Sequence, residues 1–482
     1  MKVCSVMRIL WLALAIMVPV MAPAQLTFTT NNGAITITEC NAYSTGALIV
    51  PNNINGRPVT SIANAAFSQC GKLTGITMGT NIVSIGNEAF IGCESLASII
   101  IPNGVTNIGF GVFTGCASLT NVVIPARVTS IGQDAFLDCF SLRDITIPSS
   151  VTNIGIVAFG VCSNLAVINV ANGNPVYSSI DGVLFDKNQT TLVEFPFGKV
   201  GDYTIPSNVT SIGSYAFYYC SELTNVTMGS ELASIGTGAF FHCAGFTSVT
   251  IPNSVSNIGD RAFENCFNLT KVLPGTGVVN VGQSAFASCS KLVSVAFTNS
   301  LVYIGWYAFE SCSGLTNFVI PNSVATLGSS AFEGCSGLTT MTISASVTNM
   351  EDSVFFDCPN LTNVYFEGDA PYVYYKVFDG LNDIGYYLPG TTGWTTNFSG
   401  LPMVQWLPHM QPMSVALPVP TNQFAFNINW ANGKNVVVEA CANLAAPVWT
   451  PVATNLLSNG TALIRDQNST NYLNRFYRVR TP

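Results

Sequence analysis

Apolar residues recur along the chain with a fixed period of 23 residues. In each period a phenylalanine lies three residues before a cysteine, and an apolar residue lies eight residues before it. A leucine lies three residues after the cysteine, with Phe246 as the one exception. Twelve registers share this pattern, which indicates a chain built from structural repeats. The cysteines of this column are Cys70, Cys93, Cys116, Cys139, Cys162, Cys220, Cys243, Cys266, Cys289, Cys312, Cys335 and Cys358.

One period, residues 209–229, predicts the elements of every repeat. Residues 209–212 are short and extended, and residues 215–220 are expected to form a helical turn too short to be stable alone. Residues 223–228 alternate between apolar and polar positions, which is typical of a strand. A unit of 23 residues cannot bury its own apolar face, whereas stacked units bury it against their neighbours. The pattern therefore predicts a mostly β solenoid with a parallel sheet and short helical turns.

The repeats resemble the BspA-like leucine-rich repeats, also called the Treponema type. The resemblance is carried by segments such as residues 220–228 (CSELTNVTM) and 251–259 (IPNSVSNIG), and it covers residues 55–366. It implies a curved leucine-rich-repeat solenoid with a parallel sheet on one face. BspA-like proteins include adhesins that bind host matrix proteins, so the resemblance also implies a role in adhesion.

One interval in the cysteine column is longer than the others. Cys162 and Cys220 are 58 residues apart, which is one period plus 35 residues. We therefore expect an elaborated turn over about residues 171–208, in which Asp181-Gly182 is a hairpin signal.

Both ends of the repeat array carry segments that are expected to cap its core. Residues 25–54 alternate around Asn31-Asn32-Gly33 and predict an N-terminal β-hairpin cap. Residues 359–408 lack the cysteine and phenylalanine columns, and residues 367–408 are expected to form the C-terminal cap.

A second module follows the array. Residues 409–420 contain several prolines and are expected to be a linker, and residues 421–482 predict a small antiparallel β-sandwich of immunoglobulin or fibronectin-III type. Its basic tail, residues 475–480, is expected to contact an anionic wall polymer or the acidic solenoid, or else to be a solvated strand edge. The predicted strands are residues 424–430, 436–444, 448–454, 462–465 and 476–480.

Residues 1–24 predict a secretory signal peptide. Lys2 and Arg8 precede a short apolar stretch, and cleavage is expected after Ala24. The alternative is a membrane anchor, but a span needs about 20 apolar residues and this stretch is shorter. We therefore expect a secreted or cell-surface protein with no transmembrane segment in the mature chain.

Composition argues against several function classes. Charged residues make up 9% of the chain and the net charge is −8, which argues against nucleic acid and anionic membranes as partners. His242 and His409 are the two histidines, and the motifs of common hydrolases, metalloproteases and nucleotide-binding enzymes are absent. We expect no enzymatic activity, no cofactor and no metal, with a polysaccharide-active enzyme that uses paired carboxylates as an alternative.

The cysteine column is expected to consist of buried free thiols. Each repeat contributes one cysteine in the same register beside the phenylalanine column, facing the core. Disulfides remain an alternative in a secreted protein. A metal site is a further alternative, although zinc sites use closely spaced cysteine pairs, which this sequence lacks.

Two surfaces are candidates for binding. The outward strand positions are mostly Thr, Ser and Asn, which form a hydrogen-bonding face or simply suit exposed strands. The positions around the Phe and Cys columns usually hold small or polar residues, but two consecutive repeats hold aromatic ones, and Trp306 and Tyr307 form a smaller group. Stacking of the repeats should bring the aromatic residues together, either to bind a ligand or to cover the elaborated turn. The candidate binding residues are Tyr215, Tyr218, Tyr219, Phe241 and His242.

These observations predict a non-enzymatic extracellular binding or adhesion protein. The repeat face is expected to contact an extracellular protein or a glycan, and the chain is expected to be a monomer. The main alternative is a structural component of a matrix or envelope, in which the solenoid is a spacer.

Overall fold

The computed structural model describes residues 26–379, 384–412, 424–471 and 474–482. The predicted signal peptide and residues 413–420 of the predicted linker lie outside the described residues. The chain divides into two compact units, Met1–Leu165 with Val170–Pro175 and Ala166–Asn169 with Val176–Pro482. Each unit is described by itself.

The first unit begins with a hairpin. β1 pairs antiparallel with β2, and the two residues between them, Asn32 and Gly33, both have a positive φ, as a two-residue hairpin turn requires. Short strands of successive turns then pair in parallel, in the orders β10-β8-β6-β3 and β13-β11-β9. The strands are β1 (Leu26–Asn31), β2 (Ala34–Cys40), β3 (Gly46–Val50), β4 (Asn53–Ile54), β5 (Arg57–Ile62), β6 (Leu73–Met78), β7 (Ser84–Ile85), β8 (Ser98–Ile100), β9 (Asn107–Ile108), β10 (Asn121–Val123), β11 (Ser130–Ile131), β12 (Asp144–Ile147) and β13 (Asn153–Ile154), with β14 (Val167–Val170) at the boundary between the units.

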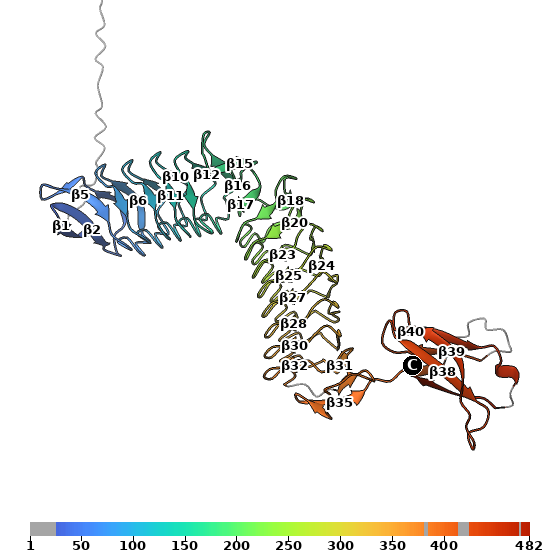
Figure 1. The fold of residues 1–482 in the computed structure, drawn as a ribbon. Coiled ribbons are helices and arrows are strands. Elements are labelled where there is room, and N and C mark those ends of the chain that lie inside the picture. The colour runs from blue at the N-terminus through green and yellow to red at the C-terminus, as the bar shows by residue number, and fades with distance from the viewer. Residues whose placement is uncertain (1–25, 380–383, 413–423, 472–473) are drawn as a thin grey trace, which may run out of the picture. The chain divides into compact units, whose positions relative to one another are not determined.

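The second unit continues the same architecture. Strands of one sheet follow in the order β15-β16-β17-β19-β21-β23-β25-β27-β28-β30-β32, and Figure 1 shows those from β23 to β32 as successive rungs. The other faces carry the sheets β18-β20, β22-β24-β26 and β29-β31-β33-β35-β34. The strands are β15 (Tyr177–Ile180), β16 (Val183–Asp186), β17 (Thr191–Glu194), β18 (Gly201–Thr204), β19 (Ser211–Ile212), β20 (Leu223–Thr227), β21 (Ser234–Ile235), β22 (Ser248–Thr250), β23 (Asn257–Ile258), β24 (Lys271–Leu273), β25 (Asn280–Val281), β26 (Ser294–Val295), β27 (Tyr303–Ile304), β28 (Thr326–Leu327), β29 (Thr340–Ile343), β30 (Asn349–Met350), β31 (Asn363–Phe366), β32 (Tyr372–Val373), β33 (Ile384–Tyr387), β34 (Asn397–Phe398) and β35 (Leu401–Gln405).

The predicted helical turns are wrong. In the turn before β20, the N–H groups of Tyr215 and Tyr219 donate to the carbonyls of Thr237 and Phe241 on the next turn, each at 2.8 Å. The N–H of Tyr218 donates to the carbonyl of Tyr215, three residues back, instead of four residues back as in an α-helix. Tyr215 and Tyr219 have φ values of 56° and 60°, in the left-handed region. Because the turns stack, backbone N–H groups of this segment donate to carbonyls of the next turn. The segment therefore forms a ladder of inter-turn hydrogen bonds instead of a helix.

The phenylalanine column forms the core of the stack. Rings of successive turns stack face to face, as in Phe263 and Phe286 at 5.3 Å and 2°. The cysteine thiols lie beside this column, and all except those of Cys70 and Cys220 donate to the phenylalanine carbonyl of the preceding turn, as Cys243 does to Phe217 at 3.0 Å. A glycine follows most of the short strands because turns approach closely there: a Cβ on Gly259 would lie 2.6 Å from a backbone carbon of the preceding turn.

The stack extends further than the sequence pattern indicated. Phe378 lies in the segment expected to lack the phenylalanine column, yet its ring stacks on Phe355 at 5.9 Å and is buried. Near the elaborated turn, Phe195 occupies the corresponding place and packs against Phe217 at 4.9 Å. Both residues continue the column without a cysteine three positions later, and this is why the expected pattern missed them.

The C-terminal residues form two antiparallel sheets of three strands, β36-β37-β40 and β39-β38-β41. They enclose a core of Phe426, Ile428, Val436, Val438, Leu457 and Ile464. The strand β36 lies inside the segment expected to be a linker; it ends in a proline, which an edge strand tolerates. The elements are β36 (His409–Pro412), β37 (Phe424–Asn429), β38 (Asn435–Cys441), β39 (Thr450–Leu456), β40 (Thr461–Asp466), β41 (Phe476–Arg480) and a 3-10 turn, η2 (Ser469–Asn471). Within the described ranges, no helix is long and apolar enough to cross a membrane.

Candidate functional site

The structure brings the five predicted binding residues together on two consecutive turns. Tyr215, Tyr218 and Tyr219 lie between β19 and β20, and Phe241 and His242 lie at the same positions between β21 and β22. Tyr218 stacks on Phe241 at 5.6 Å and 17°, and Tyr219 stacks on His242 at 4.2 Å and 15°. Tyr215 contacts Tyr218 edge-on at 5.7 Å. We call these five half-buried side chains the aromatic cluster.

The backbone of the turns sets the directions of these side chains. Tyr215, Tyr219 and His242 all have a positive φ, between 56° and 60°, which fixes where each Cβ points. The inter-turn ladder holds the backbone at regular spacing, so residues of the same column stand above one another. The rings therefore stack because of the repeat and need no specific side-chain hydrogen bonds.

One glycine makes room for the cluster. Gly238 occupies the column position of Tyr215 on the next turn, and the Tyr215 ring lies over it. An ideal Cβ on Gly238 would lie 2.3 Å from Cε1 of Tyr215. Residue types alone do not show which side chain lies over Gly238, so the link between this glycine and the site could not be predicted from the sequence.

The cluster extends by a residue that the sequence analysis did not name. Phe267, on the third turn, contacts His242 edge-on at 5.2 Å and 89°, and 38% of its surface is exposed. It follows the cysteine Cys266 directly, at a position where neighbouring repeats hold Ser221, Ala244 and Ser290. A comparison of that column along the repeats would have revealed it.

Charge is sparse around the cluster. Burial lowers the pKa of His242, which favours a neutral imidazole at neutral pH. The Nδ1 atom of His242 is buried and has no hydrogen-bond partner among the described residues. On the next turn, burial raises the pKa of Glu264 while Arg261, 3.5 Å from it, opposes that rise. The site therefore offers ring faces and a neutral imidazole, edged by one ion pair.

The smaller aromatic group that the sequence suggested is exposed but separate. Trp306 and Tyr307 lie on one later turn of the same unit and are 48% and 36% exposed. The residues at these positions on the following turn are Ser329 and Ser330. This pair therefore lacks the second aromatic turn that creates the stacked rings of the cluster.

Another exposed group escaped the sequence analysis. Tyr372, Tyr374 and Tyr375 are 65%, 53% and 68% exposed, at the end of the long sheet of the second unit. Tyr372 pairs with Asn349 in register, and its ring meets that of Tyr374 edge-on at 5.0 Å. These residues fell in the expected C-terminal cap, so their place in the ladder was not anticipated.

The strand face, the second predicted surface, is polar over β20 and β22 of the second unit. A groove of about 510 Å³ crosses β20 and β22 and is lined by Asn225, Thr227, Ser248 and Thr250. Apolar side chains are exposed elsewhere on this face: Leu273 is 45% exposed on β24, and in the first unit Ile100 and Val123 are 74% and 72% exposed on adjacent strands.

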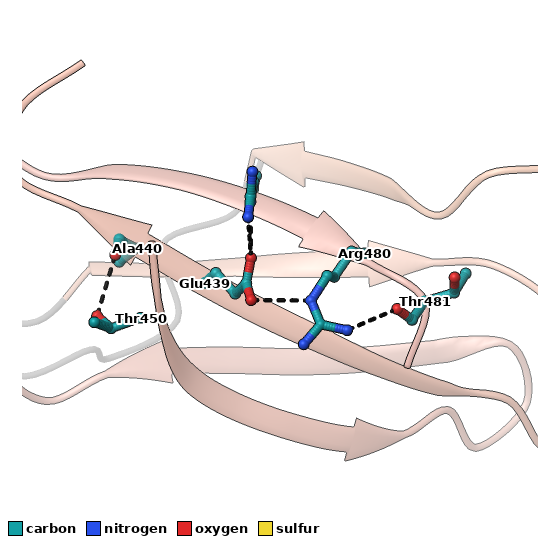
Figure 2. Close-up of polar contacts among 6 residues, drawn as sticks. Glu439, Ala440, Thr450, Arg480 and Thr481 are labelled. Carbon is teal, nitrogen blue, oxygen red and sulfur yellow. Dashed lines mark hydrogen bonds and ion pairs between the residues drawn. The ribbon is translucent and has the colours of Figure 1, made fainter. Parts of the chain in front are cut away.

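The basic tail is engaged within the C-terminal module. Arg478 and Arg480 both donate to the carboxylate of Glu439, at 2.7 and 2.9 Å, and Figure 2 shows Arg480 reaching both Glu439 and the carbonyl of Thr481. The hydrogen bond from Arg480 has the largest effect and that from Arg478 the next largest, and both lower the pKa of Glu439. Arg475 pairs with Asp466 at 2.6 Å. Ion pairs with module carboxylates therefore reduce the charge that these arginines offer to an outside polymer.

The cysteine column is buried, and its chemistry is that of protonated thiols. Burial raises the pKa of Cys266 and Cys312 to about 12 and raises that of Cys289 and Cys335 well above its usual range. A protonated thiol is a poor metal ligand and a poor nucleophile. In the part of the chain that the structure describes, no group of three His, Cys, Asp or Glu side chains could hold a metal.

Comparisons with known proteins agree with this architecture. Residues 52–191, 194–276 and 258–384 match the BspA type leucine rich repeat region. A leucine-rich repeat protein from Eubacterium ventriosum is 28% identical, with a TM-score of 0.58 over 70% of this chain and 94% of that one. This likeness supports the solenoid fold.

Two further solved structures are similar over comparable lengths. A leucine-rich repeat protein from Bacteroides ovatus is 28% identical, with a TM-score of 0.46 over 72% of this chain and 94% of that one. A leucine rich cell surface protein from Faecalibacterium prausnitzii is 24% identical, with a TM-score of 0.43 over 72% of this chain and 95% of that one. No curated protein matches the chain.

Proposed function

Because the chain belongs to the BspA-type leucine-rich repeat family, we propose that it is a non-enzymatic binding protein that acts outside the cell. It binds an extracellular protein or a glycan, as a monomer, and contributes to adhesion. The observation that carries this proposal is the aromatic cluster, which brings five half-buried aromatic side chains together on two consecutive turns.

The aromatic side chains are not needed for the turn to form. The same two left-handed positions hold Ser284 and Ser288 on a later turn, with φ values of 53° and 59° and the same ladder of hydrogen bonds. The fold thus tolerates small residues where Tyr215 and Tyr219 stand. Half-exposed rings cost solvation, and clustered aromatic residues at a surface are typical of recognition sites.

The geometry suits a ligand with flat apolar faces. Two parallel stacks, Tyr218 on Phe241 and Tyr219 on His242, lie side by side on consecutive turns. Sugar rings and the aromatic or proline side chains of a protein both stack on such faces. Glu264 and Arg261, one turn further, supply polar groups at the edge of the cluster.

Action outside the cell rests on the predicted signal peptide of residues 1–24. The low charge and the polar strand face are compatible with an extracellular ligand that carries little charge. The groove over β20 and β22 is a second surface that such a ligand could contact.

The test is an array of glycans and extracellular-matrix proteins probed with the mature chain, residues 25–482, together with sedimentation velocity. The proposal predicts saturable binding to a restricted set of ligands by a monomer. If the chain binds no ligand on the array and self-associates as its concentration rises, the result would instead support a structural spacer.

A further inference from the structure

The N-terminal cap contains a cysteine that does not belong to the column. Cys40 ends β2, and its backbone N–H donates to the carbonyl of Ala66 in the first turn at 2.6 Å. This bond fastens the cap strand to the turn that leads into Cys70. The two cysteines therefore meet where the cap covers the open end of the core.

Cys70 differs from the cysteines of the next turns in its hydrogen-bond partner. Cys93 and Cys116 donate to the phenylalanine carbonyls of the preceding turns, Phe67 at 3.1 Å and Phe90 at 3.3 Å. Cys70 belongs to the first turn, and its thiol lies 3.8 Å from the carbonyl of Cys40 and 3.9 Å from that of Asn41.

We infer that Cys40 and Cys70 form a disulfide that fastens the N-terminal cap to the first turn of the solenoid. The Cys70 thiol lies against the backbone of Cys40 and Asn41, at 3.8 and 3.9 Å from their carbonyl oxygens, and a disulfide would bring the two sulfur atoms to about 2.05 Å from each other. The bond would enclose a loop of about 30 residues, and such loops are in the range where a disulfide stabilises substantially. Fastening this end matters because repeat arrays fray from their terminal units.

The surroundings of Cys40 and Cys70 shift the pKa values of their thiols in opposite directions. The hydrogen bond from Cys70 lowers the pKa of Cys40 to about 7 against the opposing effect of burial, with a smaller contribution from Ser44. The same bond, with burial, raises the pKa of Cys70. Cys40 is therefore the better nucleophile of the two, because the thiolate is the reactive form.

The oxidant is an external disulfide, either a small-molecule one or that of a thiol oxidoreductase. The Cys40 thiolate attacks one sulfur of that disulfide, forms a mixed disulfide and releases one external thiolate. Cys70 then loses its proton to solvent and attacks the Cys40 sulfur, which releases the second external thiolate. The protein loses two electrons and two protons, and the external disulfide is reduced to two thiols.

The test uses the whole purified mature chain, incubated in glutathione buffers from reducing to oxidising and then alkylated and digested with trypsin. Trypsin does not cut between Cys40 and Cys70, because Arg57 precedes Pro58, so one peptide ending at Lys72 carries both cysteines and no other. The next peptide, residues 73–127, carries Cys93 and Cys116 and is a matched control.

In oxidising buffer the first peptide should become about 2 Da lighter than its reduced form and take no alkyl label, while the control peptide takes two labels after unfolding. Two labels on the first peptide, or an equal mass loss in the control peptide, would overturn the inference. Because the exchange is performed in vitro, this result does not depend on export or on ligand binding.

A second measurement needs no variant. Amide exchange of residues 26–50 should be slower by about tenfold or more in the oxidised chain than in the reduced chain. Equal exchange rates would overturn the fastening of the cap even if the bond forms. The variant Cys40→Ser should leave a single labelled thiol in the first peptide, and a remaining mass loss there would contradict the assignment to Cys40.

Discussion

The ring of Tyr215 occupies the space into which a Cβ atom on Gly238 would project, with its Cε1 only 2.3 Å from that position. Both residues occupy the same left-handed position on consecutive turns, with φ values of 56° and 58°. The Tyr215 side chain, 23 residues earlier in the sequence, therefore leaves no room at position 238 for a residue larger than glycine.

This relationship predicts the effect of Gly238→Ala. The methyl group must displace the Tyr215 ring, so unfolding by urea should show a loss of about 1–3 kcal/mol beyond that of Gly111→Ala. Gly111 is a matched control, because it has φ +60° in the same column and its Cβ would meet flexible side-chain atoms at 3.3 Å or more. In a Tyr215→Ala background the excess should vanish, and an excess that persists there would contradict the account.

The stacked phenylalanines predict that alanine substitutions at two adjacent positions differ strongly in their effect on stability. Phe355 is fully buried between Phe332 and Phe378, whereas Phe356 is 38% exposed. Phe355→Ala should therefore destabilise the protein by about 3–5 kcal/mol, and Phe356→Ala by clearly less. Urea titrations followed by circular dichroism measure both. Equal losses would show that the column does not dominate the core.

The buried thiols predict a loss of stability in alkali. Burial raises the pKa of Cys266 and Cys312 from 9.0 to about 12 in the folded chain, so the folded state holds protons that the unfolded state releases. Their stabilisation is complete below about pH 9 and is lost as the pH rises towards 12. Each thiol contributes a slope of about 1.4 kcal/mol per pH unit in this window.

Urea titrations at successive pH values between 8 and 11 test this. Cys266→Ala should reduce the slope of the unfolding free energy by the contribution of about one proton. A slope unchanged by this substitution would mean that the thiol is accessible to solvent in the folded state.

The extent of the fold that could be predicted from sequence follows from how regular each feature is. The period, the phenylalanine core and the strand positions are encoded by repeated residue types, and the structure places them as expected. The helical turn at residues 215–220 was mispredicted because its hydrogen bonds run to the next turn, which a single period does not contain. Phe378 was missed because the cysteine that should follow it is absent.

The site was predictable only in part, for a related reason. The five residues of the aromatic cluster stand out from their columns, so stacking alone predicted that they meet. The role of Gly238 depends on the direction in which the left-handed backbone of Tyr215 points its ring, and residue types do not encode this. Phe267 stands out from Ser221, Ala244 and Ser290 in its column and could have been predicted in the same way as the cluster. The exposed pair Ile100 and Val123 lies in the same outward column as Thr77 and Thr146, so the 23-residue period could have revealed it.

The C-terminal module predicts a stability that depends on acid pH. Hydrogen bonds from Arg480 and Arg478 lower the pKa of Glu439 in the folded module. The stabilisation is therefore present above the ordinary carboxyl pKa of about 4.3 and is lost as the pH falls through the lower folded value. Glu439→Gln should lower the melting temperature of the module at pH 7.

The difference between Glu439→Gln and the unaltered protein should shrink as the pH falls below about 4. Thermal melts at several pH values measure it, with Arg465→Gln as a control for the loss of one exposed charge on the neighbouring sheet. A difference that is constant with pH would assign the effect of the substitution to packing.

Recognition by the aromatic cluster is the central claim, and one comparison tests it directly. The dissociation constant of a ligand identified on the array is measured for the unaltered chain and for the triple variant Tyr218→Ala, Tyr219→Ala, Phe241→Ala. The matched control is Tyr372→Ala, Tyr374→Ala, Tyr375→Ala, which removes three exposed rings elsewhere in the same unit. We expect the first variant to weaken binding by about 100-fold or more and the control to bind with unchanged affinity. Unchanged affinity in the first variant, with its circular dichroism intact, would contradict the claim.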